Sequence, residues 1–449
     1  MSLGFHGCGC LRHPMSIRQF YNREVPEIAV IGTGYVGLAT GACLALLGHS
    51  VTCADIDTAK IEKLRNGVIP IVEDGLGELV GRGAAAGSLR FTTDVEAAAG
   101  GADIVFLCLP TPQGDDGSAD LSYVLGVVRQ IRSVLRPSTV LVNKSTVPVG
   151  TAVTVRELLG RDDVDVVSNP EFLRQGTAVR DFLHPSRVVI GGESSDAVER
   201  VAALYSGVDA PVLRMNTASA EALKYAANAF LATKLTFINA MADICEAVGA
   251  DIFEVASGIG LDPRIGADML RAGPGWGGSC FPKDTRALVN IAADGGYDFA
   301  LLRGVIETND EHYARIAEKV MRLCGGSVEG LVVAAWGTTF KAGTDDLRDS
   351  PAIKILRMLR DAGATVRAYD PTAKGHYPAH PWMEVGTSAL GVCEGADVLA
   401  VLTEWPEFTS VPAGSVAEVM GHRRVVDGRN HLDREAWRQA GFEYLGVGR

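Results

Sequence analysis

The sequence predicts an α/β protein in which two doubly wound domains are joined by a long central helix and a helical middle domain. Short apolar strands alternate with helical stretches near both ends of the chain, and the middle holds one long segment without Gly or Pro. Strands that are apolar on both faces and alternate with helices are typical of a parallel sheet covered by helices. The 449 residues, 47% hydrophobic and 21% charged, are those of an ordinary globular protein.

The first alternation begins at 27–32, where EIAVIG is expected to form a short apolar strand. A helix rich in Ala and Leu is expected at 37–48, and a second strand, SVTCAD, at 50–55. Later apolar segments continue the pattern, and we expect further strands at 102–110, 138–145 and 164–170. Together these elements place the first domain at residues 26–215.

The middle domain is expected at residues 216–325. Residues 217–248 contain neither Gly nor Pro and predict one helix of about 30 residues, near 45 Å at 1.5 Å per residue. A helix of that length typically spans the waist of a multidomain protein or a dimer interface. Its apolar side chains suit either position: Leu223, Ala227, Phe230, Leu231, Phe237 and Ile238.

A second strand–helix alternation begins after Gly330 and places the last domain at residues 326–449. We expect a helix at 350–363, SPAIKILRMLRDAG. The strands of this domain are expected at 331–337, 364–371, 396–403 and 423–429. The two ends of the chain therefore share one architecture, and the sequence contains no tandem repeat.

Residues 1–25 are predicted to be a disordered N-terminal extension. Cys8 and Cys10, with His6 and His13 nearby, could be interpreted as a metal clip. An extension without fixed structure is the simpler interpretation, so no metal site is predicted. The segment lacks the apolar core of a signal peptide.

Net charge and cysteine usage limit the partners and the compartment. The net charge of −12 argues against a broad nucleic-acid surface but allows a local basic pocket for an anionic metabolite. The nine cysteines lack close regular spacing, which indicates reduced thiols in the cytoplasm. No uninterrupted apolar run is long enough to cross a bilayer, so no membrane partner is expected.

A glycine-rich turn after the first strand predicts a dinucleotide site in a Rossmann-like domain. Gly32, Gly34 and Gly37 form a GxGxxG pattern that allows a tight turn and a close approach of the backbone to a pyrophosphate. The N–H groups of the helix that follows add to phosphate binding. Asp55, at the end of the next strand, suits the ribose hydroxyls and repels a 2′-phosphate. Because no arginine follows directly, we predict NAD rather than NADP.

Segments along the chain match, in order, the motifs of one known family: IGTGYVG, KSTVPVGT (144–151), NPEFLRQGTA (169–178), EALKYAANAF (221–230), GGSCFPKDT (277–285) and FKAGTDDLRDSP (340–351). Any one of them alone would be weak support, but the set extends over nearly the whole chain apart from its N-terminal extension. Taken together, they make the chain similar to the UDP-glucose/GDP-mannose dehydrogenase family.

The resemblance implies an enzyme that oxidises the C6 alcohol of a nucleotide sugar to a carboxylate, with two NAD per sugar. Such an oxidation passes through an aldehyde, which a cysteine can trap as a thiohemiacetal. A second oxidation gives a thioester, which water hydrolyses. Cys280 matches the nucleophile. We expect the glycines before it to leave room for a substrate, and nearby positive charge, such as that of Lys283, to favour the thiolate.

The same resemblance implies further catalytic residues. Lys224 and Asn228, four apart on the long helix and so on one face, would point at the reacting C6 group, where the lysine would stabilise oxyanions. Asp284 resembles the carboxylate of the first proton abstraction, and Glu171 resembles the general acid/base of thioester hydrolysis. Thr146 resembles a hydroxyl that helps to hold the catalytic water.

Contacts to the cofactor and the substrate are implied in the same way. For the cofactor they are Gly32, Gly34, Tyr35, Val36, Gly37, Asp55, Lys60, Thr111, Thr146, Lys283 and Arg348. For the nucleotide sugar they are Glu171, Phe172, Leu173, Lys224, Asn228, Arg264, Arg271, Gly277, Phe340 and Lys341. Arg264 matches an arginine that in some members reaches the sugar from the neighbouring subunit. Arg271, Lys341 and Arg348 are candidates for diphosphate contacts.

One position departs from the family pattern. Some members carry a second glutamate four residues after Glu171, where this chain has Gln175. An amide can hold a water or a cofactor amide, but it cannot accept a proton. If that glutamate matters to hydrolysis in the family, the step depends more heavily on Glu171 in this chain.

The expected reaction is the oxidation of UDP-glucose to UDP-glucuronate by a cytoplasmic homodimer. Relatives acting on N-acetylated sugars tend to have a histidine before the cysteine, where this chain has Ser279. GDP-mannose dehydrogenase keeps Ser-Cys and Pro-Lys-Asp, so GDP-mannose or another nucleotide sugar stays the alternative. An ordinary two-electron dehydrogenase would leave Cys280 incidental. A non-catalytic binding scaffold would be expected to lack some of the catalytic residues, and all of them are present.

Overall fold

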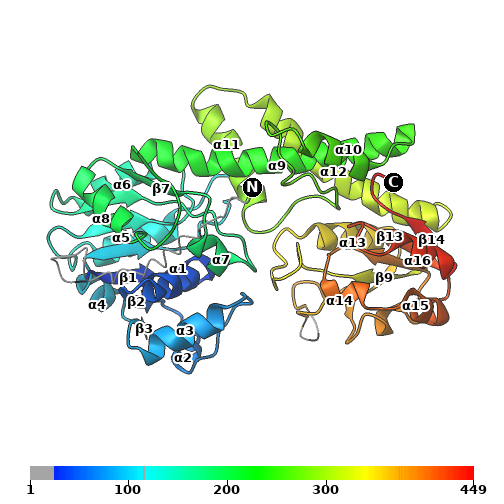
Figure 1. The fold of residues 1–449 in the computed structure, drawn as a ribbon, viewed down its shortest axis with the longest axis horizontal. Helices are drawn as coiled ribbons and strands as arrows, with labels where there is room; N and C mark the ends of the chain where they lie inside the picture. The colour runs from blue at the N-terminus through cyan, green and yellow to red at the C-terminus, as the bar shows by residue number, and fades with distance from the viewer. Residues whose placement is uncertain (1–24, 115–116, 374, 376) are drawn as a thin grey trace, which may run out of the picture.

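Two sheets lie at opposite ends of the protein in the computed structural model, and long helices connect them along one side (Figure 1). The structure describes residues 25–114, 117–373, 375 and 377–449. The predictions for residues 1–25, including the alternative of a metal clip at Cys8 and Cys10, therefore fall outside the described residues, apart from Val25. The predicted fold class, two Rossmann-like domains with a helical middle region, is confirmed.

The first sheet has eight strands in the order β3-β2-β1-β4-β5-β6-β7-β8. All neighbours pair in parallel except β6 and β7, which run antiparallel. The predicted strands are present as β1, β2, β4, β5 and β6, whereas β3, β7 and β8 were not predicted. The bounds are β1 Glu27–Ile31, β2 Ser50–Ala54, β3 Leu89–Thr92, β4 Ile104–Leu107, β5 Val140–Asn143, β6 Asp165–Ser168, β7 Val188–Gly192 and β8 Val212–Met215.

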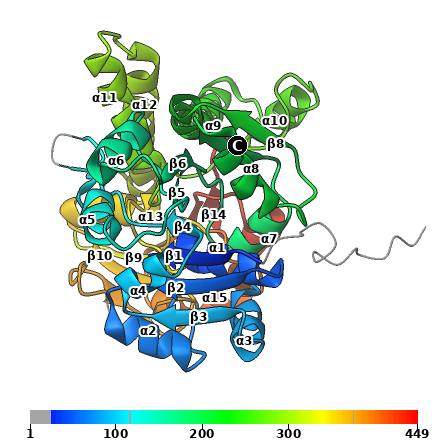
Figure 2. The ribbon, with the colours of Figure 1, turned by 90° about the vertical axis from the view of Figure 1, so that its left-hand side faces the viewer.

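Alternate side chains of each strand pack into two separate hydrophobic cores, one on each face of this sheet. On β1, Ile28 and Val30 pack with α1, α3, α7 and α8, whereas Ala29 and Ile31 pack with α4, α5 and α6. Figure 2 shows the two groups of helices on either side of the stacked strands. The bounds are α1 Tyr35–Leu46, α2 Thr58–Arg65, α3 Leu76–Ala85, α4 Val95–Gly100, α5 Ser122–Ile131, α6 Thr151–Leu159, α7 Ala178–Leu183 and α8 Ser195–Ala203.

One helix, α9 (Thr217–Val248), connects the two ends of the protein (Figure 1). It begins after Asn216, whose side chain accepts a hydrogen bond from the N–H of Ser219, and ends at Gly249 in the left-handed conformation. Its 32 residues correspond to about 48 Å, as the sequence predicted. Packed beside it are α10 (Ile252–Gly260), α11 (Phe281–Asp294) and α12 (Ala300–Leu323). No helix in the described part of the chain is long and apolar enough to cross a membrane.

The second sheet has six strands in the order β11-β10-β9-β12-β13-β14, and every neighbouring pair is parallel. Side chains of β9 again point to two cores: Val333 faces α12 and α13, and Trp336 faces α15 and α16. The bounds are β9 Val332–Trp336, α13 Pro351–Asp361, β10 Thr365–Tyr369, β11 Glu384–Val385, η2 Gly391–Cys393, β12 Val398–Val401, α14 Pro406–Thr409, α15 Ala413–Val419, β13 Arg424–Asp427, α16 Arg434–Gln439 and β14 Glu443–Leu445.

The substitution Trp336→Ala is expected to lower the free energy of unfolding by about 3–5 kcal/mol. Trp336 is 0% exposed, its ring centroid lies 5.3 Å from that of Phe408, and its Nε1 donates to the Ala389 carbonyl. Denaturant unfolding followed by circular dichroism measures the loss. Tyr123→Ala, at a side chain that is 50% exposed, is the control and should change the free energy by less than about 0.5 kcal/mol. A loss below about 1 kcal/mol at Trp336 would contradict its place in this core.

Candidate active site

The turn between β1 and α1 has the geometry of a phosphate cradle. Gly32 has φ +98°, and a Cβ there would lie 2.3 Å from the Cys108 carbonyl oxygen. A Cβ at Gly37 would lie 1.9 Å from the carbonyl oxygen of Gly32, so both glycines are required by the close packing of strand and helix. A Cβ at Gly34 would meet nothing within 4 Å, and no side chain caps the helix that follows. The first N–H groups of α1 therefore face an open approach.

Asp55 follows β2 directly and lies beside this turn. It accepts hydrogen bonds from Thr33 Oγ1 at 2.7 Å and from the N–H of Asp57 at 3.0 Å, and Lys60 Nζ lies 3.0 Å away. Burial would raise the pKa of Asp55, but these bonds outweigh it and hold that pKa below its usual value. The side chain is therefore an ionised carboxylate at neutral pH, at the end of the second strand as predicted.

Two pairs of polar side chains link α9 to the segments around it. Lys224 Nζ lies 3.2 Å from Glu171 Oε1, and the two side chains are only 5% and 6% exposed. One turn along the helix, Asn228 Nδ2 donates to Asp284 Oδ2 at 2.6 Å. Asp284 Oδ1 also accepts from Lys283 Nζ at 2.5 Å. The structure thus brings together these residues from α9, α11 and the loop after β6, as the sequence predicted.

The neighbours of Lys224 keep its side chain protonated. Burial alone would lower the pKa of this ammonium, but Glu171, Cys280 and Asp284 raise it above its ordinary value. A buried ammonium that stays protonated is a fixed positive charge. It can stabilise an oxyanion without first having to gain a proton.

Cys280 lies at the N-terminus of α11, within electrostatic reach of this cluster. Burial raises the pKa of its thiol, Glu171 and Asp284 raise it further, and Lys224 and Lys283 lower it. The net pKa is above that of an ordinary cysteine. The two lysines favour the thiolate, as expected of nearby positive charge, but burial outweighs them and was not foreseen.

The glycines before Cys280 serve a different purpose from the expected one. A Cβ at Gly277 would lie 1.9 Å from the Asp349 carbonyl oxygen, and one at Gly278 would lie 2.9 Å from the Phe340 ring. Protein atoms of the C-terminal domain fill these positions. The expectation that these glycines leave room for a substrate is therefore wrong at both, and their absent side chains let the loop pack against that domain.

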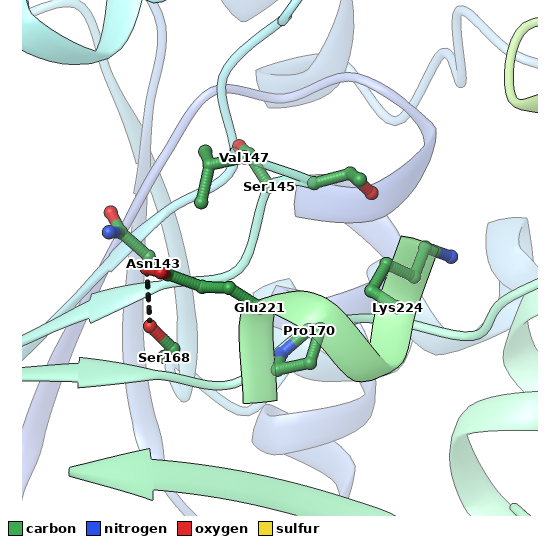
Figure 3. Close-up of a pocket in the computed structure, with 8 residues that line it drawn as sticks. Asn143, Ser145, Val147, Ser168, Pro170, Glu221 and Lys224 are labelled. Carbon is green, nitrogen blue, oxygen red and sulfur yellow. Dashed lines mark hydrogen bonds between the residues drawn. The ribbon is translucent and has the colours of Figure 1, made fainter. Parts of the chain in front are cut away.

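A small cavity lies between the start of α9 and the loop after β5, and Lys224 is among the residues that line it (Figure 3). It has a volume of about 10 Å³, and in Figure 3 Glu221 and Lys224 from α9 lie on one side of it, with Ser145 and Val147 across from them. Thr146 also lines the cavity and is 8% exposed. Thr111, another predicted cofactor contact, donates from Oγ1 to the Thr146 carbonyl at 2.9 Å.

The remaining predicted residues divide into those near the cluster and those at the surface. Two cations lie over the ring of Phe172, with Arg187 Cζ at 3.9 Å and Lys224 Nζ at 5.1 Å from its centroid. Glu171 Oε2 accepts from the N–H of Leu173 at 2.5 Å. The partly buried Val36 packs against the N-terminal core. By contrast, Arg264 is 87% exposed and pairs with Asp262 in its own loop.

The three candidate diphosphate contacts have different surroundings. Arg348 makes a bidentate pair with Asp346 and lies within electrostatic reach of Cys280. Lys341 Nζ lies 5.7 Å from the Phe340 ring, and burial followed by repulsion from Arg174 lowers its pKa. Arg271 is exposed.

Sequence reasoning missed two cations close to these residues. Arg429 Nη2 donates to the Phe340 carbonyl at 2.9 Å, and its Nε lies 3.0 Å from Glu404. Lys144 is buried, donates to Asn169 Oδ1 at 3.0 Å, and has its pKa lowered by burial to about 8. The motif KSTVPVGT contains Lys144, so its place in that motif was the available signal.

Comparison with known proteins connects this geometry to a family. Residues 26–209 match the NAD binding domain of the UDP-glucose/GDP-mannose dehydrogenase family, residues 218–311 match its central domain, and residues 334–434 match its UDP binding domain. The chain belongs to this family. It is an NAD-dependent nucleotide-sugar dehydrogenase, as the sequence motifs predicted.

Individual family members match over nearly their whole length. The UDP-glucose 6-dehydrogenase TuaD of Bacillus subtilis is 45% identical, over 94% of this chain and 93% of the relative. The UDP-glucose 6-dehydrogenase of Rhizobium meliloti is 44% identical, over 94% of this chain and 99% of the relative. The solved UDP-glucose dehydrogenase of Pyrobaculum islandicum is 35% identical and superimposes with a TM-score of 0.87, covering 97% of this chain and 99% of that one. A GDP-mannose dehydrogenase from Pseudomonas aeruginosa, 29% identical, gives 0.52, covering 93% and 99%.

The dinucleotide turn fits the NAD of this family. The open side of Gly34 and the uncapped start of α1 suit a pyrophosphate, and the Asp55 carboxylate suits ribose hydroxyls. These features lie at the C-terminal ends of β1 and β2, next to each other in the sheet.

The thiol of Cys280 is expected to react with iodoacetamide with an apparent pKa above that of a free cysteine, about 8.5. Burial and two carboxylates raise this pKa, so the thiolate fraction at pH 7 is small and the alkylation rate should still be rising above pH 8.5. Rates measured by mass spectrometry of the Cys280 peptide between pH 6 and 10 give the titration, in steps of about half a unit. Replacing Lys224 by Met should raise the apparent pKa further. A wild-type midpoint below about 8 would contradict this electrostatic balance.

Proposed function

We propose that the protein is an NAD-dependent UDP-glucose 6-dehydrogenase that makes UDP-glucuronate. The observation that carries the proposal is the convergence of Cys280, Lys224, Asn228, Asp284 and Glu171 in one buried cluster, reached from three separate segments. The UDP binding domain and the names of the relatives support UDP-glucose as substrate. The alternative is GDP-mannose or another nucleotide sugar.

In the proposed mechanism the first oxidation takes place beside Asp284 and Lys224. Asp284, fixed by Asn228 and Lys283, accepts the proton of the C6 hydroxyl through a water. The fixed ammonium of Lys224 stabilises the negative charge that develops on the C6 oxygen. NAD, when bound, would accept the hydrogen and the two electrons removed from C6 in each of the two oxidations.

The proposed second half of the reaction belongs to Cys280. The Cys280 thiol first loses its proton to solvent. The thiolate sulfur then forms a bond to C6 of the aldehyde, the π electron pair moves to oxygen, and Lys224 again faces that charge. After the second oxidation C6 is a thioester. Glu171 takes a proton from a water held with the help of Thr146, the oxygen bonds to C6, and the C–S bond breaks to release the carboxylic acid and the Cys280 thiolate.

The roles of the binding residues are proposed on the same basis. We propose that Gly32, Gly34, Tyr35, Val36, Gly37, Asp55, Lys60, Thr111, Thr146, Lys283 and Arg348 contact NAD, and that Phe172, Leu173, Arg271, Gly277, Phe340 and Lys341 join the cluster in contacting the sugar nucleotide.

The domain boundaries predicted from the sequence, 26–215, 216–325 and 326–449, are kept as part of this proposal. The seven cysteines of the described residues are all free, which supports a cytoplasmic location.

The test of the substrate and the reaction is the yield of NADH. Purified protein with limiting UDP-glucose should give about two NADH per sugar, because the alcohol is carried to the acid in two oxidations. GDP-mannose and UDP-N-acetylmannosamine at the same concentration should give rates lower by about 100-fold or more. One NADH per sugar would contradict the four-electron reaction, and a preference for GDP-mannose would establish the alternative substrate.

Replacing Cys280 by Ala should abolish UDP-glucuronate formation, with a loss of at least about 10³-fold. Removing the sulfur takes away the group that retains the aldehyde. Liquid chromatography of the products measures the effect. Cys324→Ala is the control, because Cys324 is also partly buried but lies after α12, away from the cluster, and it should keep normal activity. UDP-glucuronate production at the normal rate by the Cys280 variant would refute covalent catalysis.

We also propose that the protein is a homodimer formed through α9. Four of its apolar side chains are exposed, Phe230 at 66%, Phe237 at 52%, Ile244 at 51% and Val248 at 71%. Their spacing of seven, seven and four residues places them on one face of the helix. An exposed apolar stripe of this length indicates a surface that is covered in the assembly. Arg264, exposed within one chain, would then be available to the partner's site.

Replacing Phe230 and Phe237 together by Glu should convert the dimer to a monomer of 47.4 kDa, because two carboxylates would be buried in the interface. Light scattering at constant protein concentration measures the mass. Val153→Glu, at an exposed apolar residue on α6, is the control and should stay dimeric. A wild-type protein that is monomeric and fully active would remove the proposal.

A further inference from the structure

Gln175, where the chain departs from its family, lies at the contact between the two sheet-bearing domains. Its Nε2 donates to Asp346 Oδ2 at 2.9 Å and reaches Ser279 Oγ at 3.3 Å. Its Oε1 accepts from Thr344 Oγ1 at 3.2 Å. The side chain of Gln175, from the N-terminal domain, therefore binds both the segment containing Thr344 and Asp346 and the loop that carries Cys280.

Two of the partners of Gln175 lead to residues of the candidate active site. Ser279 Oγ lies 3.6 Å from Cys280 Sγ. Asp346 is only 5% exposed and makes a bidentate pair with Arg348.

The next residue brings the backbones into contact as well. A Cβ at Gly176 would lie 2.5 Å from the Gly343 carbonyl oxygen, so the backbone segments around these two residues are in contact. The dinucleotide turn reaches the same segment, because Tyr35 donates from its hydroxyl to Asp345. The segment 343–346 is thus held from the N-terminal domain at several points around Gln175.

The hydrogen bonds of Gln175 require a side chain that both donates and accepts. An ionised glutamate has the same shape but can only accept, so it would place a second carboxylate beside Asp346 where the amide now donates at 2.9 Å. Two carboxylates at this separation cannot both ionise without repulsion, and they share one proton instead. Burial would raise the pKa of Asp346, but Arg348 and Gln175 outweigh it and keep that pKa below its usual value.

We propose that Gln175 is a positioning residue that clamps the C-terminal domain and the Ser279–Cys280 loop onto the N-terminal domain, and that this requires an uncharged side chain able both to donate and to accept. It touches none of the reacting atoms. The inference rests on the proposed function only in treating Cys280 as the nucleophile. Gln175 holds the site closed and, as an amide, transfers no proton.

The first test removes the hydrogen bonds and keeps the length of the side chain. Gln175→Met should increase the rate of Cys280 alkylation by iodoacetamide at pH 7.5 by at least about fivefold, because the loop beside Ser279 loses its tether. Gln130→Met is the control, since Gln130 also donates to a carboxylate, Glu96, at 3.3 Å but on the exposed surface of the N-terminal domain. This measurement needs neither NAD nor sugar, so it stands even if UDP-glucose is not the substrate.

The second test uses charge and pH. The charged groups facing residue 175 are Asp346 and Arg348 from the C-terminal segment, with Glu73 bonded to the N–H of Gly176, Asp345 bonded to Tyr35, and Cys280 beyond Ser279. In Gln175→Glu, a protonated glutamate can donate to Asp346 and restore the clamp. Its pKa is raised by Asp346, so the clamp is present below that pKa and lost above it. The kcat of this variant, relative to wild type at each pH, should fall at least about tenfold from pH 6 to pH 8.5.

The direction of the pH effect separates the clamp from a simple charge effect. If the negative charge merely raised the pKa of Cys280, activity would be low at low pH and would recover at high pH. This is the opposite of the fall with pH expected for loss of the clamp. Gln130→Glu should show the wild-type profile at every pH. The proposal is overturned if Gln175→Met alkylates within about twofold of wild type, or if the Gln175→Glu ratio is flat or rises with pH. A wild-type yield of one NADH per sugar would instead count against the proposed function alone.

Discussion

The buried ion pair between Lys224 and Glu171 is the interaction on which the candidate active site depends. The two side chains are only 5% and 6% exposed, and burying a charge without a partner costs free energy. Each side chain therefore needs the other in place. The pair fixes where α9 lies relative to the loop after β6. Asn228, one turn further along α9, then determines where Asp284 and the start of α11 lie. The geometry of the cluster follows from one helix and two polar contacts.

The long helix gives this arrangement its rigidity across the domain boundary. Its N-terminal half contacts the first sheet, where Glu221 accepts from the N–H groups of Gly150 and Ala152 at the start of α6. Its C-terminal half contributes Ile238, Ala242 and Cys245 to the core under the second sheet. A single continuous backbone therefore belongs to both domains. Relative movement of the sheets has to be absorbed by loops such as the one that carries Cys280.

Most strands of the first sheet could be predicted from runs of apolar residues, and β1, β2, β4, β5 and β6 were found in this way. Two of the missed strands have weaker signals: β3 alternates buried and exposed residues, and β8 has no buried residue at the sheet edge. The third, β7, is apolar and buried on both faces and was missed all the same. The antiparallel direction of β7 could not be predicted, because the periodicity of side chains is the same in both directions.

The members of the active-site cluster could be predicted because each lies in a motif of its own. Their surroundings could not, since these depend on residues far apart in the sequence. Gln175 and Asp346 are separated by 171 positions, and nothing near either one indicates the other. The raised pKa of Cys280 was missed for the same reason, because burial is a property of the assembled fold.

The packing of the glycine loop also constrains how such proteins can be recombined. The glycine loop of the middle domain and the segment around Phe340 and Asp349 are complementary surfaces, with a carbonyl and a ring occupying the places of missing side chains. In a chimaera that takes its C-terminal domain from a relative, the glycine loop would pack against a surface from a different protein. Residues 273–285 and 340–351 should therefore be exchanged together, although they belong to different domains and the rest of α11, α12 and β9 lie between them in the sequence.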